Sequence, residues 1–401
     1  MSLPGGPVRV ARPALAQRTV GFTESVIREM TRLNAQHGGI NLAQGFPDFP
    51  APAEIKEAAK RAIDADVNQY AITWGAPSLR RAIAASYREL YAMDVDPETM
   101  LTVTCGATEA MISTLLAVVD PGDEVVVLEP FYENYGPDTA ICGAVPVYVP
   151  LRPPENGFDP DELRRAFSAR TKAIIVNSPH NPTGAVLSST AVREIARIAR
   201  ERDLWVLSDE IYGETLYDGE HRSLLAEDAM DERTILLDGF SKTYAMTGWR
   251  LGFGVFPRPL VDPVTKLVTN SVSCTATFVQ RAGVAALSSR PPEVDAMVRA
   301  FRERRDAIVA GLNAVPGVTC LLPKGAFYVF PNITGLGLGN SAQVADRFLY
   351  EAGVAVLAGT AFGRAGEGYL RLSYANSLAN IQLALGRIAE WATGVVAPAA
   401  R

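Results

Sequence analysis

The sequence predicts an α/β protein: a large part built on a mostly parallel sheet with helices on both faces, and a smaller α+β part. From about Leu101, short β-branched runs alternate with stretches of helical periodicity. Several of these runs are apolar without interruption, which is typical of parallel strands buried on both faces. After about Ser289 the pattern changes to one long helix followed by scattered short strands.

The strands of the larger part are expected at residues 101–104, 124–128, 145–149, 172–177, 204–208, 233–237 and 250–255. Helices are expected between them, at 108–119 and 189–202. In the second of these, Val192, Ile195 and Ile198 recur at helical spacing. Together these elements predict a sheet with helical crossovers.

The smaller part is expected to contain a helix at 291–315, strands near 327–330, 354–356 and 369–374, and a last helix at 378–391. The first 17 residues are rich in Pro, Gly and Ala and are expected to form an arm. We therefore predict an arm with part of the small domain at 1–45, a large domain at 46–289 and a small domain at 290–401.

Composition excludes several classes of protein. Of 401 residues, 48% are hydrophobic and 20% charged, which excludes a disordered chain. The net charge of −6 argues against a nucleic-acid partner. The 4 cysteines form no CxxC pair, which disfavours a metal site or a disulfide framework. No secretory signal or membrane-length apolar run is visible, so we expect a soluble, cytoplasmic protein without a membrane partner.

Ligands of open α/β sheets bind where strands end, so the residues after each strand are the candidates for function. After 101–104, the small residues Gly106, Ala107 and Thr108 open a helix whose free N–H groups suit a phosphate. An ordinary strand–helix turn is the alternative.

Two further turns follow strands. In SPHNPTG, after 172–177, prolines and a glycine make a rigid turn that can direct the Asn181 amide into a site. A purely structural turn, with His180 also structural, is the alternative. Asp209 follows 204–208, where a buried acid requires a partner such as a cationic ring nitrogen, and Tyr212 is expected to face the same pocket. The alternative for Asp209 is a helix N-cap.

Lys242 lies among small and apolar residues after 233–237. Burial there would lower its pKa and favour the neutral, nucleophilic amine. Arg250 supplies a permanent cation suited to phosphate. An exposed loop lysine is the alternative, but its neighbours fit that poorly. An amine, an acid, a phosphate cradle and a cationic clamp are together the parts that pyridoxal phosphate needs.

Taken together, these segments resemble those of a known family, the class I aminotransferases. SKTYAMTGWR resembles their lysine motif, NSPHNPTG their N-P-T-G turn, SDEIY their D-x-x-Y motif and YLRLSYANS their carboxylate-binding arginine segment. The similarity runs from about Ile40 to Arg387. INLAQGFPDFP, GATEA and EPFYENY are further similar to the kynurenine and glutamine transaminase branch.

The resemblance implies the fold of the type I pyridoxal-phosphate-dependent transferases, the cofactor itself, and amino acid and 2-oxo acid substrates. By matched position, Lys242 would be the Schiff-base lysine and proton shuttle, and Asp209 would pair with the pyridine nitrogen. The resemblance also assigns the other matched positions. Around the cofactor, Tyr212 and Asn181 would hydrogen-bond to the ring oxygen, Tyr132 would stack on the ring, and the phosphate would be bound by Gly106, Ala107, Thr108 and Arg250.

The substrate carboxylate would be bound by Gly45 and Arg371. Tyr70 would reach the phosphate of a neighbouring subunit, which implies a homodimer with shared active sites.

Two positions depart from the family pattern. Gly239 stands where relatives often have a serine that donates to the phosphate, a role that Ser241 is expected to take over. Thr108 stands where some aspartate-preferring relatives have a lysine. We therefore expect a large neutral, aromatic or Gln/Met-like donor to be favoured over aspartate. The aromatic residues Phe22, Trp74 and Tyr132 would suit such a donor, although core packing explains them equally well.

Three alternatives stay open. A carbon–sulfur β-lyase would use the same site residues, and an aspartate-type aminotransferase would differ only in its donor. A transcription regulator with an aminotransferase-like sensor domain would need a DNA-binding module, but only about 40 residues precede the first motif, and they lack a helix-turn-helix pattern.

Overall fold

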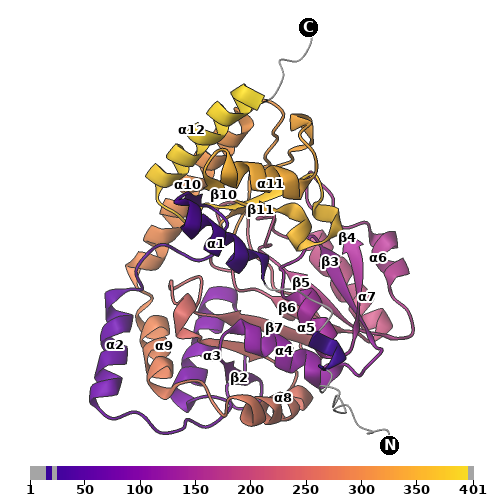
Figure 1. The fold of residues 1–401 in the computed structure, drawn as a ribbon. Helices are drawn as coiled ribbons and strands as arrows, with labels where there is room; N and C mark the ends of the chain where they lie inside the picture. Colours follow the sequence, from indigo (N-terminus) through magenta and orange to yellow (C-terminus); the bar gives the residue numbers. More distant parts are fainter. Residues whose placement is uncertain (1–14, 20–24, 396–401) are drawn as a thin grey trace, which may run out of the picture.

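A seven-stranded sheet forms the centre of the computed structural model, which describes residues 15–19 and 25–395 (Figure 1). Its strand order is β2-β8-β7-β6-β5-β3-β4. The strands are β2 (Leu101–Thr104), β3 (Glu124–Glu129), β4 (Val145–Pro150), β5 (Thr171–Asn177), β6 (Trp205–Asp209), β7 (Thr234–Gly239) and β8 (Gly252–Val255). All pairs from β4 to β7 are parallel, and β8 is antiparallel to both of its neighbours. The predicted α/β class with a mostly parallel mixed sheet is confirmed.

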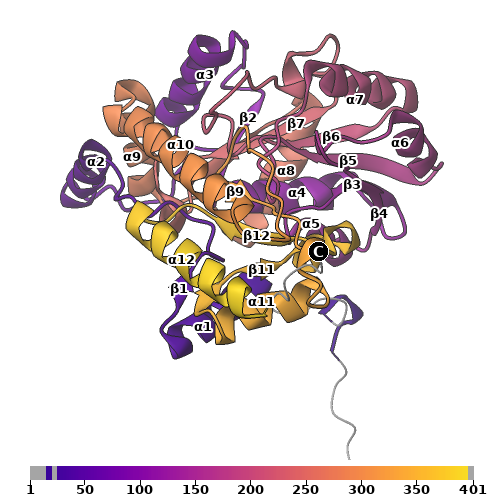
Figure 2. The same ribbon diagram turned by 90° about the horizontal axis from the view of Figure 1, so that it is seen from above.

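Helices cover both faces of this sheet, which explains why its strands are apolar without interruption (Figure 2). Val125 and Val127 pack in one cluster with side chains of α4, α5 and α8, whereas Val126 and Leu128 pack with α6 and α7 on the other face. The helices of this part are α2 (Ala53–Asp64), α3 (Pro77–Tyr91), α4 (Ala107–Val118), α5 (Tyr135–Ile141), α6 (Pro160–Ala166), α7 (Ser189–Arg202), α8 (Arg258–Ser271) and α9 (Thr277–Ser289).

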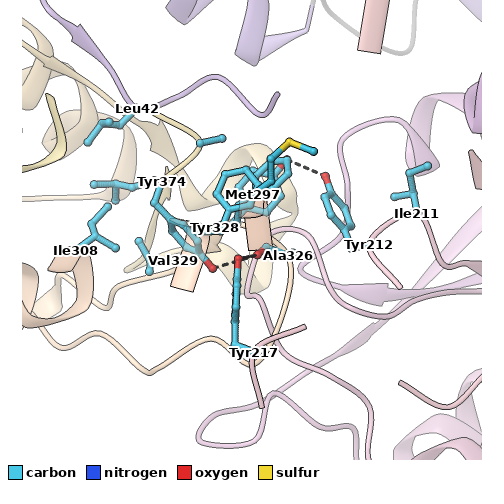
Figure 3. Packing of buried hydrophobic residues seen from close by; sticks show 14 of the residues in the cluster. Leu42, Ile211, Tyr212, Tyr217, Met297, Ile308, Ala326, Tyr328, Val329 and Tyr374 are labelled. Carbon is cyan, nitrogen blue, oxygen red and sulfur yellow. Dashed lines mark hydrogen bonds between the residues drawn. The ribbon is translucent and has the colours of Figure 1, made fainter. Parts of the chain in front are cut away.

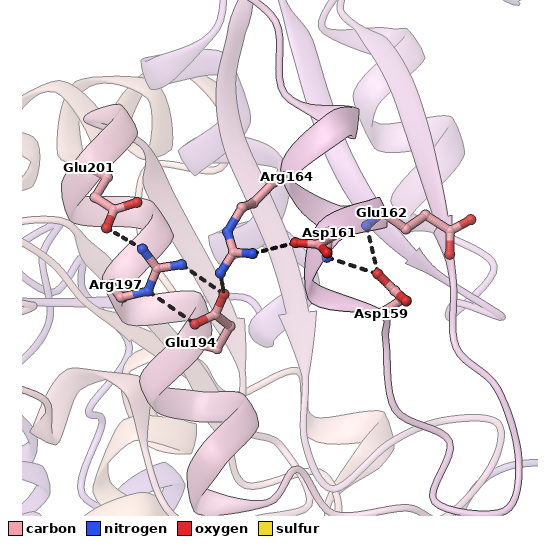
Figure 4. Close-up of polar contacts among 7 residues, drawn as sticks. All are labelled: Asp159, Asp161, Glu162, Arg164, Glu194, Arg197 and Glu201. Carbon is pink, nitrogen blue, oxygen red and sulfur yellow. Dashed lines mark hydrogen bonds and ion pairs between the residues drawn. The ribbon is translucent and has the colours of Figure 1, made fainter.

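Ion pairs join the outer surfaces of α6 and α7 (Figure 4). Arg164 pairs with Asp161 on its own helix and with Glu194 on α7. Arg197 pairs with Glu194 and Glu201 along α7. Exposed pairs of this kind contribute about 0–1 kcal/mol each, so burial of apolar side chains under the helices supplies most of the stability here.

The second part of the molecule combines both ends of the chain. Strand β1 (Ile40–Asn41) pairs in parallel with β10 (Val354–Ala355), and β9 (Tyr328–Val329), β12 (Leu370–Ser373) and β11 (Leu357–Ala358) form an antiparallel sheet. Its helices are α1 (Val26–His37), α10 (Pro292–Asn313), α11 (Ser341–Tyr350) and α12 (Leu378–Val395). The domain boundaries proposed above stay predictions. In the two described ranges, no helix has both the length and the apolar character of a membrane span.

One hydrophobic cluster joins the two parts (Figure 3). Tyr212, after β6, packs edge-to-face against Tyr328 of β9, and their hydroxyl oxygens lie 2.8 Å apart. Tyr374 donates to the Ala326 carbonyl at 3.1 Å, and Tyr217 donates to the same oxygen. This cluster fixes the second part over the edge where β5, β6 and β7 end.

Candidate active site

A cavity of about 500 Å³ lies at this edge of the sheet. It collects most of the residues that the sequence singles out, from both parts of the chain. Those that line it are Gly45, Ala107, Thr108, Tyr132, Asn181, Asp209, Tyr212, Ser241, Lys242, Arg250 and Arg371. The parallel strands bring these residues together because their carboxyl ends lie at the same edge of the sheet. Asn177 and Asp209, for example, are register partners at the ends of β5 and β6.

Lys242 enters the cavity from the turn after β7. Its Nζ donates to the Gly45 carbonyl at 2.9 Å and lies 5.8 Å and 5.7 Å from the ring centres of Tyr212 and Phe327. Burial lowers the pKa of Lys242 to about 8, with a smaller contribution from the positive charge of Arg371. Its surroundings therefore make the neutral amine accessible near neutral pH, as expected for a nucleophilic lysine.

Asp209 ends β6 and faces the same cavity. Its Oδ2 accepts from the Tyr135 hydroxyl at 2.6 Å, and its Oδ1 accepts from the Ile211 amide at 3.3 Å. Burial raises the pKa of Asp209, and the Tyr135 bond opposes that shift. A carboxylate in such a site, bonded by one hydroxyl and one backbone amide, still favours a cationic partner.

Sequence reasoning missed Tyr135. The residue opens α5, three positions after Tyr132, and it faces Asp209 only because α5 lies against the ends of the strands. The available signal was a second tyrosine in the segment EPFYENY.

Arg371 of β12 is fully buried. Its Nη1 donates to Asn181 Oδ1 at 3.1 Å and its Nη2 to the Ala43 carbonyl at 2.6 Å. The guanidinium carbon lies 4.6 Å and 4.7 Å from the ring centres of Tyr328 and Phe362. Its Nε has no hydrogen-bond partner among the described residues. A buried donor without a partner is costly, so this guanidinium is suited to a carboxylate ligand.

The proposed phosphate end lies at the N-terminus of α4. Gly106, which precedes the helix, has φ 81°, a left-handed conformation that favours glycine. A Cβ there would lie 2.4 Å from Arg250 Nη2, and a Cβ on Gly252 would lie 2.4 Å from the Ala107 amide nitrogen. Free helix N–H groups and a guanidinium therefore meet at one point, which is an anion site.

Two other glycines have a steric explanation. A Cβ on Gly45 would lie 2.4 Å from the Tyr328 hydroxyl oxygen. A Cβ on Gly239 would lie 2.9 Å from both Gly252 Cα and the Leu251 carbonyl oxygen. The close pairing of β7 and β8 thus leaves little space for the serine that the family often has at Gly239, while Ser241 does line the cavity.

Some of the predicted residues lie outside the cavity. Gly106 does not line it and lies against the Arg250 guanidinium. Tyr70 is 84% exposed, on the connection between α2 and α3. Its role in a neighbouring subunit stays a prediction. Trp74 does not line the cavity, and Phe22 lies outside the described residues.

The residues present fit pyridoxal phosphate and an amino acid. The cradle at Gly106, which a Cβ would fill, suits the phosphate, and Asp209 suits the ring nitrogen. The unsatisfied Nε of Arg371 suits the substrate carboxylate. Lys242 is the amine that can bind the cofactor covalently.

The comparisons with known proteins agree with this geometry. The family model "Aminotransferase class I and II" matches residues 37–388. An aspartate aminotransferase of Pyrococcus horikoshii is 41% identical, over 93% of this chain and 96% of its own length. The aromatic-amino-acid aminotransferase 2 of Thermococcus litoralis is 39% identical, over 94% and 97%. The structure of a Thermus thermophilus aspartate aminotransferase with maleate has a TM-score of 0.90 at 36% identity, over 95% of this chain and 100% of that one. The chain therefore belongs to the class I and II aminotransferases, which are enzymes that depend on pyridoxal phosphate.

Proposed function

We propose that this enzyme transfers the amino group of a large neutral or aromatic L-amino acid to a 2-oxo acid, and that it favours such donors over aspartate. The main support is the arrangement of Lys242 and Arg371. Both donate to carbonyls of one short segment, at Gly45 and Ala43 respectively. A carboxylate bound at Arg371 would therefore hold the substrate Cα within reach of the Lys242 amine.

Each residue of the cavity would have a separate role in binding or proton transfer. Arg371 and Asn181 bind and orient the α-carboxylate, and Lys242 Nζ takes the proton from Cα as general base and returns it as general acid. Pyridoxal phosphate, when bound, supplies the electron sink for the bond that breaks at Cα. Asp209 keeps the cationic ring nitrogen paired. Arg250 and the N-terminus of α4 hold the phosphate in place.

The donor preference rests on Thr108, which stands where some aspartate-preferring relatives have a lysine. Thr108 lines the cavity and offers no positive charge to an acidic side chain. The name of the Thermococcus litoralis relative supports an aromatic donor, as does the similarity of the motifs to the kynurenine and glutamine transaminase branch. An aspartate-type aminotransferase is the second candidate, because other relatives have that name.

Tyr70 supports a homodimer with shared active sites. Its side chain is largely exposed in the single chain, as a residue that completes a neighbour's site would be. Sedimentation of the purified holoenzyme would test the dimer. A Tyr70→Phe variant that binds the cofactor as tightly as the wild type would exclude the shared contact.

The function is tested by measuring kcat/KM for phenylalanine, methionine, glutamine and aspartate with 2-oxoglutarate as acceptor. We expect at least one neutral donor to exceed aspartate. Lys242→Ala should abolish turnover with all of them, whereas Lys266→Ala, on the outer helix α8, should not. Turnover by Lys242→Ala would refute the mechanism, and a clear preference for aspartate would select the second candidate.

A further inference from the structure

Three ionisable residues of the cavity have no role in the function proposed above. Lys242, Asp209 and Arg250 serve the cofactor and Arg371 the α-carboxylate, which leaves Asp138 of α5, Glu133, after Tyr132, and Arg28 of α1. Glu133 Oε1 accepts from the hydroxyl of Ser25 at 2.6 Å. Within residues 15–19 and 25–395, no cation lies within ion-pair distance of this carboxylate.

The Glu133 carboxylate, placed at the cavity wall by its bond to Ser25, acts electrostatically on three other residues of the cavity. Burial is the main cause of the raised pKa of Tyr132 and Tyr328, and the negative charge of Glu133 adds to it. Burial lowers the pKa of Arg371, and the same charge partly opposes that shift. Of these three, Arg371 binds the substrate carboxylate in the proposed function, and the Tyr328 ring lies 4.6 Å from its guanidinium carbon.

Ser25 fixes this carboxylate in position. It is the N-cap of α1, and its oxygen also accepts from the Arg28 amide at 3.4 Å. The same serine therefore joins the first turn of α1 to the segment that contains Tyr132. Arg28 lies one turn further along α1 and is exposed, without an ion pair to Glu133. The carboxylate is thus held at the cavity wall and is not neutralised by a contact pair.

We propose that Glu133 determines the charge that the enzyme tolerates on a substrate side chain. This inference rests on the proposed function and deepens it. A second substrate carboxylate would enter a partly desolvated space that already holds a fixed carboxylate, and like charges in such a space repel strongly. Neutral and aromatic side chains do not meet this repulsion, so Glu133 selects against acidic substrates by an unfavourable contact.

The test separates the effect of the negative charge of Glu133 from the effect of the shape of its side chain. Glu133→Gln removes the charge and keeps an oxygen that can accept from Ser25, whereas Glu133→Asp keeps the charge. We expect Glu133→Gln to raise the ratio of kcat/KM for aspartate to that for phenylalanine at least about tenfold. Glu133→Asp should stay near the wild-type ratio. Glu29→Gln, which removes an exposed charge on α1 outside the cavity, is the matched control and should leave the ratio unchanged.

Binding to the holoenzyme gives a second readout that does not depend on turnover. By titration calorimetry, Glu133→Gln should tighten binding of the dicarboxylate maleate relative to the monocarboxylate hydrocinnamate, and added salt should reduce the difference between variant and wild type. Unchanged ratios in an active Glu133→Gln enzyme would overturn this inference and leave the transaminase function intact. Absence of turnover in the wild type with every donor would instead refute the proposed function.

Discussion

A buried acid on α5 should contribute less to the stability of the enzyme at neutral pH than at acidic pH. Asp138 is 8% exposed, and its Oδ2 has no hydrogen-bond partner among the described residues. Burial alone raises its pKa to about 7, from 3.8 for an ordinary aspartate. The folded state therefore binds this proton more tightly than the unfolded state does. The contribution of Asp138 to stability is full below about pH 4 and is lost as the pH rises to about 7.

Asp138→Asn removes this pH-dependent cost while keeping the shape of the side chain. The difference in pKa corresponds to about 4 kcal/mol above pH 7 and to between 1 and 2 kcal/mol at pH 5, at about 1.36 kcal/mol per pH unit. The buried amide would itself cost about 1–3 kcal/mol at every pH. The diagnostic quantity is thus the change with pH: relative to wild type, the variant should gain roughly 3 kcal/mol between pH 5 and pH 8.

Urea unfolding of both holoenzymes at pH 5, 6, 7 and 8 measures this gain. Asp64→Asn is the matched control, because Asp64 is exposed at the end of α2, and its stability difference from wild type should not vary with pH. If the difference between Asp138→Asn and wild type were the same at pH 5 and pH 8, Asp138 would not be held protonated by burial, and the reasoning would fail.

Three further changes test the site. Tyr135→Phe removes the hydrogen bond that lowers the pKa of Asp209, so the acidic limb of the kcat/KM profile should move to higher pH, with a loss of roughly tenfold or more at neutral pH. Gly106→Ala places a Cβ against Arg250 at a positive φ, and titration with pyridoxal phosphate should show binding weakened roughly tenfold. Arg371→Lys loses the forked contact, which should raise the donor KM at least about tenfold with a smaller effect on kcat, and an unchanged KM would contradict its role.

The elements around the central sheet could be predicted from sequence because short local patterns determine where each helix and strand begins and ends. Helix α7 was expected at 189–202 and spans Ser189–Arg202, since a capping Ser188 and apolar residues at helical spacing define it without help from the rest of the chain. The strands of the larger sheet begin and end within about two residues of their expected positions, because unbroken apolar runs leave few alternatives.

The site could be predicted only in part. Lys242 and Asp209 follow strands of the sheet, so the rule that ligands bind at strand ends finds them. Arg371 lies on a strand of the second part, and only the family resemblance indicated it. Tyr328 and Glu133 were missed, because a tyrosine in a short strand and a glutamate in a loop have no distinguishing local pattern. Their places in the cavity arise from approaches between distant segments, which sequence spacing does not reveal.

The contact between Arg371 and the Ala43 carbonyl also constrains the order in which the protein acquires its function. The two residues are 328 positions apart, and β1 can pair with β10 only after both have been synthesised. Strands β2 to β8 are complete much earlier, so the half of the pocket that they form can fold while the ribosome still holds the rest. Closing so long a loop is slow. The proposed carboxylate site at Arg371 should therefore form last, when the two ends of the chain meet.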